Sequence, residues 1–141
     1  MNAYAQSVDT YLAQRVLTAG PEQQAALLME AGQRHLGKAI KAIEQKDYVE
    51  QARCLGRVSE IILESTTRLN FEGGGELALN LAKIYDWWTR EIFEAGTTRN
   101  VARLNVLSHH MGQIRQGWEQ LHEKQAKTTP FTEAHVGDRV V

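Results

Sequence analysis

Apolar residues recur every three or four positions through most of the chain, which is the spacing of one face of an α-helix. Apolar–polar alternation of the kind that marks β-strands is absent. The chain has only two prolines, Pro21 and Pro130, and they bracket the whole periodic region. Pro21 suits the first turn of a helix, where its missing N–H has no partner in any case. The predicted helices cover about residues 21–45, 47–70, 76–95 and 101–124.

Residues with strong end preferences mark the limits of these helices. Asp47, with Glu50 three residues later, predicts a capping box at the start of the second helix. Gly96 is predicted to be the C′ residue that ends the third helix, because glycine adopts the left-handed conformation without strain. Thr97 or Thr98 is then predicted to be the N-cap of the fourth helix.

Each predicted helix has one apolar face, so the four helices are expected to pack as an antiparallel up-down bundle. A weaker pattern before Pro21 predicts a short additional N-terminal helix, which at this length needs a surface to dock against. The periodic pattern stops near the end of the chain. We therefore expect an all-α fold, with a bundle domain over residues 1–125 and a flexible C-terminal tail over residues 126–141.

The third predicted helix has more apolar residues than one core-facing stripe requires. The residues of its expected core stripe are Leu77, Leu81, Ile84, Trp88, Ile92 and Ala95. Leu79 and Phe93 lie opposite this stripe, fourteen residues apart and nearly in register. Tyr85 and Trp87 lie on its two flanks. Surplus apolar residues in the first and second helices are Leu27 and Ile61.

Three interpretations of this apolar surplus are open. Single exposed apolar residues are common on soluble proteins, so these can be scattered surface residues. The segment before Pro21 can instead cover them. In the third interpretation, they form a hydrophobic groove that accepts an amphipathic segment of a partner protein.

Composition and charge limit the class of protein. With 141 residues, 43% of them hydrophobic, the chain is long enough for one domain with its own core. A formal net charge of -1 argues against a nucleic-acid binder, which needs a basic surface. The single cysteine, Cys54, cannot form an internal disulfide, and no apolar run approaches the roughly 20 residues that span a bilayer. The N-terminus does not resemble a signal peptide, so we expect a cytoplasmic protein with no membrane insertion.

Patterns that indicate catalysis or metal binding are weak. Glu119 and His122 have the Glu-x-x-His spacing of di-iron bundles, but such a site needs a second copy of the motif and two further carboxylates. His109 and His110 are adjacent, so their side chains point about 100° apart on a helix. No nucleophile is paired with a base. We therefore expect no enzyme activity, no cofactor and no metal.

Several short motifs occur in the order and spacing of a known protein family. They are Tyr11, Val16 and Thr18-Ala19-Gly20-Pro21-Glu22, then Arg68-Leu69-Asn70, Gly74-Gly75-Glu76-Leu77-Ala78-Leu79-Asn80-Leu81, Ile84-Tyr85-Asp86 and Trp118. Together they resemble the flagellar export chaperones of the FliS family over about residues 4–124. The chain departs from the family pattern at Gln24, at Leu28-Met29-Glu30-Ala31 and at Trp87-Trp88. These departures would suit a diverged flagellin or a different client.

The resemblance implies a cytoplasmic chaperone that holds the disordered C-terminal region of flagellin. Such a chaperone prevents premature polymerisation and delivers the subunit to the flagellar export gate, without a nucleotide or metal. The expected partner-binding residues are Tyr11, Val16, Leu69, Asn70, Leu79, Asn80, Tyr85, Asp86, Trp87 and Phe93.

Individual members of this set have alternative roles. The segment with Tyr11 and Val16 is expected either to lie over the groove and move when the client binds, or to be a permanent fifth helix. Asn70 is expected to cap helix carbonyls or to present its amide to the client. Asn80 and Asp86 are expected to hold polar groups of the client or to be simply solvated.

Other functions stay open from the sequence alone. A helical adaptor or secretion chaperone for a different client would use the same fold and groove. An enzyme or a metal-storage bundle would need a bound cofactor or metal. A self-assembling bundle would use the groove to form a homodimer.

Overall fold

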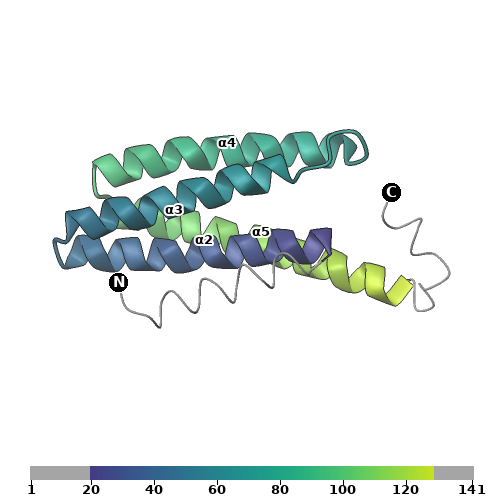
Figure 1. The fold of residues 1–141 in the computed structure, drawn as a ribbon, viewed down its shortest axis with the longest axis horizontal. Helices are drawn as coiled ribbons and strands as arrows, with labels where there is room; N and C mark the ends of the chain where they lie inside the picture. Colours follow the sequence, from purple (N-terminus) through teal and green to yellow (C-terminus); the bar gives the residue numbers. More distant parts are fainter. Residues whose placement is uncertain (1–19, 129–141) are drawn as a thin grey trace.

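The computed structural model describes residues 20–128, and this part of the chain contains four α-helices and no strand. The helices are α2 (Pro21–Glu44), α3 (Tyr48–Thr67), α4 (Gly75–Thr97) and α5 (Val101–Thr128). The predicted all-α class is confirmed, and the helices lie alongside one another with their connections at alternate ends (Figure 1). The predicted N-terminal helix lies outside the described residues. α5 passes the predicted domain boundary at residue 125, and the division into bundle and tail stays a prediction.

Local hydrogen bonds explain where α2 ends and α3 begins. The side chain of Asp47 accepts a hydrogen bond of 3.2 Å from the backbone N–H of Glu50, as the capping-box pattern predicts. Lys46, just before it, has a positive φ of 59°. In this left-handed conformation the chain reverses, and the Asp47 N–H donates to the carbonyl of Ala42 at 2.8 Å. A backbone hydrogen bond therefore holds the turn between α2 and α3 in place.

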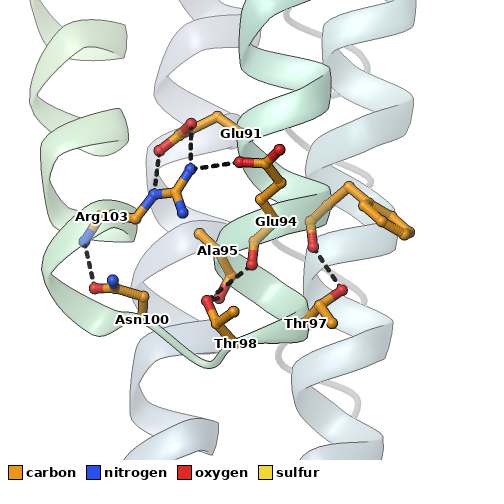
Figure 2. Close-up of polar contacts among 8 residues, drawn as sticks. Glu91, Glu94, Ala95, Thr97, Thr98, Asn100 and Arg103 are labelled. Atoms are coloured by element: carbon orange, nitrogen blue, oxygen red, sulfur yellow. Dashed lines mark hydrogen bonds and ion pairs between the residues drawn. The ribbon is translucent and has the colours of Figure 1, made fainter.

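The connection between α4 and α5 differs from the sequence prediction. Gly96 is inside α4, which continues to Thr97, and the left-handed residue is Arg99 with a φ of 51°. Asn100 is the N-cap of α5, since its side-chain oxygen accepts a hydrogen bond of 3.1 Å from the backbone N–H three residues later (Figure 2). The hydroxyls of Thr97 and Thr98 donate backwards to carbonyls of α4 instead. The predicted roles of Gly96, Thr97 and Thr98 are therefore wrong.

The core is built from one apolar face of each helix. α2 packs along both α3 and α5, whereas α4 packs against α3 and α5 and, among the described residues, makes no close backbone contact with α2. The largest fully buried side chains include Trp88, Tyr85, Met29, Leu36, Ile62, Leu104, Leu107 and Met111. Burial of one such side chain stabilises the fold by roughly 1.5–3 kcal/mol.

Two residues of α4 are placed differently from the predicted stripe. Tyr85, expected on a flank, is only 1% exposed. Its ring centroid lies 5.2 Å from that of Trp88, and its hydroxyl accepts a hydrogen bond of 3.4 Å from the indole N–H of Trp118. Leu77, expected in the core, is 55% exposed. Leu77 lies in the first turn of α4, at the end of the bundle where α4 and the end of α5 diverge (Figure 1).

Candidate partner-binding groove

A shallow groove with a volume of about 410 Å³ runs between α3 and α4 on the outside of the bundle. The residues that line it are Gln51, Ala52, Leu55, Gly56, Ser59, Thr89, Ile92, Phe93, Gly96 and Thr97. None of these side chains is charged, and those of α3 that face outward are small. We call this feature the α3–α4 groove. Its lining suits an apolar ligand surface that approaches the backbone closely.

The width of the groove is set where α3 and α4 approach each other at Gly96. A Cβ atom on Gly96 would lie 2.8 Å from Cδ1 of Leu55, so a larger residue would force the Leu55 side chain to shift. The side-chain amide of Gln51 donates a hydrogen bond of 2.9 Å to the Gly96 carbonyl. Gln51 is buried, and a buried polar contact of this kind fixes the spacing of the two helices.

Exposed apolar side chains lie on the outward faces of α3 and α4, at the groove and beyond it toward the glycine-rich turn. On α4, Leu79 is 54% exposed and Phe93 is 74% exposed; on α3, Val49 is 84% exposed and Leu63 is 65% exposed. The members of each pair are fourteen residues apart, which is about 21 Å along a helix. We call these pairs the apolar strips. Two matched strips beside an uncharged groove are typical of an interaction surface rather than of scattered exposed residues.

Val49 and Leu63 were not predicted from the sequence. Both are exposed on the outward side of α3, away from its core stripe. The available signal was their spacing, since Val49, Gly56 and Leu63 are seven residues apart, as are Leu79, Asp86 and Phe93. Two such series become meaningful only when the helices that carry them are neighbours.

Trp87 lies on the other side of α4 from the groove. Its ring centroid is 6.0 Å from that of His110 on α5, and the side chain is exposed. The structure therefore separates Trp87 from Leu79 and Phe93. Leu27 is buried and Ile61 is partly buried, so neither adds to the exposed apolar surface that the sequence analysis expected.

The polar residues expected at the site lie at the surface of α4. Asn80 and Asp86 are both exposed. Asp86 lies midway between Leu79 and Phe93 in sequence, and its carboxylate accepts a hydrogen bond of 2.6 Å from Arg90. Asp86 and Arg90 therefore place an ion pair beside the α4 strip.

Asn70 organises the glycine-rich turn between α3 and α4. Its side-chain oxygen accepts a hydrogen bond of 2.9 Å from the Gly73 N–H, and its carbonyl accepts one of 2.7 Å from the Gly74 N–H. Gly75 has a positive φ of 52°. The oxygen of Asn70 thus shapes the turn, and the contact of its amide with the client stays a prediction. Leu69, next to it, is partly buried against the core.

A charged cluster ties α4 to the start of α5. The guanidinium of Arg103 donates two hydrogen bonds to Glu91, at 2.7 and 2.8 Å, and one to Glu94 at 2.9 Å (Figure 2). The hydrogen bonds from Arg103 hold the pKa of Glu91 below its usual value. The cluster fixes the position of α4 relative to α5 at this end of the bundle.

Reactive side chains are few in the part of the chain that the structure describes. Cys54 is fully buried, and burial together with the negative charge of Glu50 raises the pKa of its thiol. Among the residues described, no group of three or more His, Cys, Asp and Glu is placed to hold a metal ion. None of the helices described is long and apolar enough to cross a membrane. Tyr11 and Val16, the two remaining expected site residues, lie outside the described part.

The fold and the groove define a small helical-bundle protein with a surface suited to an apolar segment of another chain. Comparison with protein families then identifies the relatives. The family described as Flagellar protein FliS matches residues 3–125, and the chain belongs to this family. The resemblance read from the short motifs is therefore confirmed over nearly the whole chain.

Individual relatives are similar along most of their length. The chain is 29% identical over 119 residues to the flagellar secretion chaperone FliSB of Pseudomonas aeruginosa. The aligned region covers 84% of this chain and 94% of that protein. It is 29% identical over 126 residues to the flagellar secretion chaperone FliS of Salmonella typhimurium, and the aligned region covers 88% of this chain and 90% of that protein. It is 26% identical over 115 residues to the flagellar secretion chaperone FliS of Vibrio cholerae, covering 82% of each.

Proposed function

We propose that this protein is a cytoplasmic flagellar export chaperone that binds the disordered C-terminal region of flagellin. It prevents premature polymerisation of flagellin and delivers it to the export gate. The observation that carries the proposal is the α3–α4 groove with its two apolar strips, in a member of the FliS family. The relatives named flagellar secretion chaperones support the export role.

The groove suits a client that folds as it binds. Ordering a disordered segment costs about 2–5 kcal/mol of the gross interaction energy. An amphipathic helix in the groove offsets this, because it buries its own apolar face together with Val49, Leu63, Leu79 and Phe93. The apolar face of the client is then no longer available for self-association. An antiparallel bundle supplies two adjacent helices on which such a client can lie.

The other expected residues take more specific parts in this proposal. The segment with Tyr11 and Val16 covers part of the groove and repacks when the client binds. Asp86 and Asn80 hold polar groups of the client beside the α4 strip. Tyr85 acts indirectly, by packing against Trp88 and so fixing α4 in place.

A binding experiment tests the proposal directly. A flagellin C-terminal peptide is titrated into the purified full chain and into the variants Leu79→Asp and Phe93→Asp. We expect each variant to weaken binding at least about tenfold, which is about 1.4 kcal/mol, with an unchanged circular dichroism spectrum. Val106→Asp is the control, since Val106 is a similarly exposed apolar residue on α5.

If the unmutated protein does not bind the flagellin peptide, the client is wrong. If Val106→Asp weakens binding as much as Leu79→Asp does, the α3–α4 groove is the wrong surface.

A further inference from the structure

We propose that the α3–α4 groove binds its client helix in one direction only. The N-terminus of the client helix lies at the glycine-rich turn, and its C-terminus lies at Arg99. The client helix then runs parallel to α4 and antiparallel to α3. The inference rests on the proposed function, because it requires a helical client in this groove.

One end of the groove carries fixed positive charge. Tyr48 lies one turn before Ala52 on α3, and the guanidinium of Arg99 is stacked over its ring, 3.8 Å from the centroid. Arg99 follows Thr97, which lines the groove, by two residues. Lys46 and Asp47, at the α2–α3 connection just before Tyr48, are both exposed, and their charges are opposite, so Arg99 supplies the net positive charge at this end. A guanidinium stacked on a ring keeps its N–H edges available for an anionic group.

Negative charge lies beyond the other end of the groove, about 20 Å further along α4 at the glycine-rich turn. Glu72 in the glycine-rich connection and Glu76 in the first turn of α4 are both exposed. Glu76 precedes Leu79 by three residues, so the two are neighbours on the surface of α4. Arg68, at the same end, is engaged by Glu64 at 3.3 Å and by Gln24 at 2.8 Å. The next cation on α4 is Lys83, about two turns beyond Glu76.

The dipole of a bound client helix interacts with these charges and favours one of its two directions in the groove. The N-terminus of a helix carries about half a positive charge and its C-terminus about half a negative charge. The preferred direction therefore places the N-terminus beside Glu72 and Glu76 and the C-terminus beside Arg99. Glu76 and Arg99 lie near opposite ends of the 23-residue helix α4, so a client helix needs about the same number of residues, roughly 34 Å, to reach both charged ends. Because the groove lining itself is uncharged, the charges at its ends decide the direction.

Paramagnetic labelling of the client measures this direction. A flagellin C-terminal peptide carries a nitroxide at its N-terminus or at its C-terminus and is added to the full chain labelled with ¹⁵N. We expect the N-terminal label to broaden amide signals of Gly73–Glu76, and the C-terminal label to broaden those of Thr97–Asn100. The reverse pattern, or equal broadening of both ends by either label, overturns the inference and leaves the proposed function intact. Absence of binding, or binding away from the groove, overturns both.

Charge substitutions provide a second readout. Arg99→Glu is expected to weaken peptide binding about two- to fivefold at low salt, and the difference is expected to disappear near 1 M salt. Arg99→Asn removes the charge, and asparagine tolerates the left-handed backbone conformation. This variant therefore distinguishes loss of the charge from a disturbed fold. The control is Lys41→Glu, the same change in charge on α2, which makes no close backbone contact with α4. An equal effect of Lys41→Glu, or tighter binding by Arg99→Glu, contradicts the inference.

Discussion

Two non-glycine residues have left-handed backbone conformations, one in the α2–α3 connection and one in the α4–α5 connection. Lys46 and Arg99 each adopt a positive φ at the end of a helix, where glycine is the favoured residue. A side chain in this conformation strains the backbone, by up to roughly 1–2 kcal/mol relative to an ordinary helical conformation. The stacking of Arg99 on Tyr48 offsets part of this strain energy, whereas Lys46 is exposed at the surface.

We predict that Lys46→Gly stabilises the protein by about 0.5–1 kcal/mol, because glycine adopts this conformation without a Cβ clash. Urea unfolding followed by circular dichroism measures the change in the free energy of unfolding. Lys41→Gly is the matched control and is expected to destabilise, since Lys41 lies in the last turn of α2, inside the helix. A loss of stability in Lys46→Gly would contradict the assigned backbone conformation.

We predict that Arg103→Gln reduces the free energy of unfolding at pH 7, because the hydrogen bonds from the guanidinium to Glu91 and Glu94 are lost. Because Arg103 holds the pKa of Glu91 below its ordinary value of 4.5, the folded state gains this stability above that pH. The difference between the two proteins therefore shrinks as the pH falls below about 4.5 and vanishes below the lowered pKa. Urea unfolding over this pH range measures it. Arg90→Gln, from a well-exposed ion pair, is the control and should show a smaller effect; a difference that grows toward acid would contradict the assignment.

At the scale of the elements, the positions of α3 and α4 depend on glycines in different ways. Gly96 lets α4 approach α3, and Gly74 lies against the backbone of Asn70 in the turn. A Cβ on Gly74 would clash with the Asn70 carbonyl oxygen and lie 2.9 Å from Cβ of Ala78. Gly37 and Gly56, in contrast, are exposed in helices with nothing within 4 Å of the added Cβ.

We predict that Gly74→Ala destabilises the protein by about 1–3 kcal/mol, because the backbone of Asn70 cannot move aside without disrupting the turn. Gly37→Ala, in the interior of α2, is expected to stabilise it by about 0.5–1 kcal/mol through helix propensity. Thermal unfolding of both variants measures the contrast. If Gly74→Ala were as stable as Gly37→Ala, the turn would not have the described geometry.

The sequence predicted the elements better than their ends and their mutual positions. Asp47 was identified as an N-cap because a cap depends only on local residues. Gly96 was misassigned because its small size serves a contact with α3, which no local pattern reveals. Leu77 fits the apolar period of α4, yet it is exposed because α5 diverges there. The groove was only partly predictable for the same reason, since it needs Val49 and Leu63 of α3 beside the strip of α4.

At the scale of the whole molecule, the fold leaves one uncharged surface open between two otherwise well-packed helices. Gly56 lies in the middle of this surface, between Val49 and Leu63. Its lack of a side chain keeps the groove open without any role in the core. A larger residue at this position would therefore fill the groove and leave the bundle unchanged.

We predict that Gly56→Leu weakens binding of the flagellin peptide at least about tenfold while it preserves or raises thermal stability. Gly37→Leu is the matched control, an equally open helical glycine on α2, and should bind normally. Calorimetric titration gives the affinities and thermal unfolding gives the stabilities. Normal binding by Gly56→Leu would mean that the client does not enter the groove.

The most direct test of the central claim is a methyl NMR spectrum of the full chain, labelled at valine and leucine, with and without the flagellin peptide. We predict that the methyl signals of Val49, Leu63 and Leu79 shift on binding, and that those of the exposed Val106 on α5 do not. Shifts confined to Val106 and other residues outside the α3–α4 groove would contradict the account.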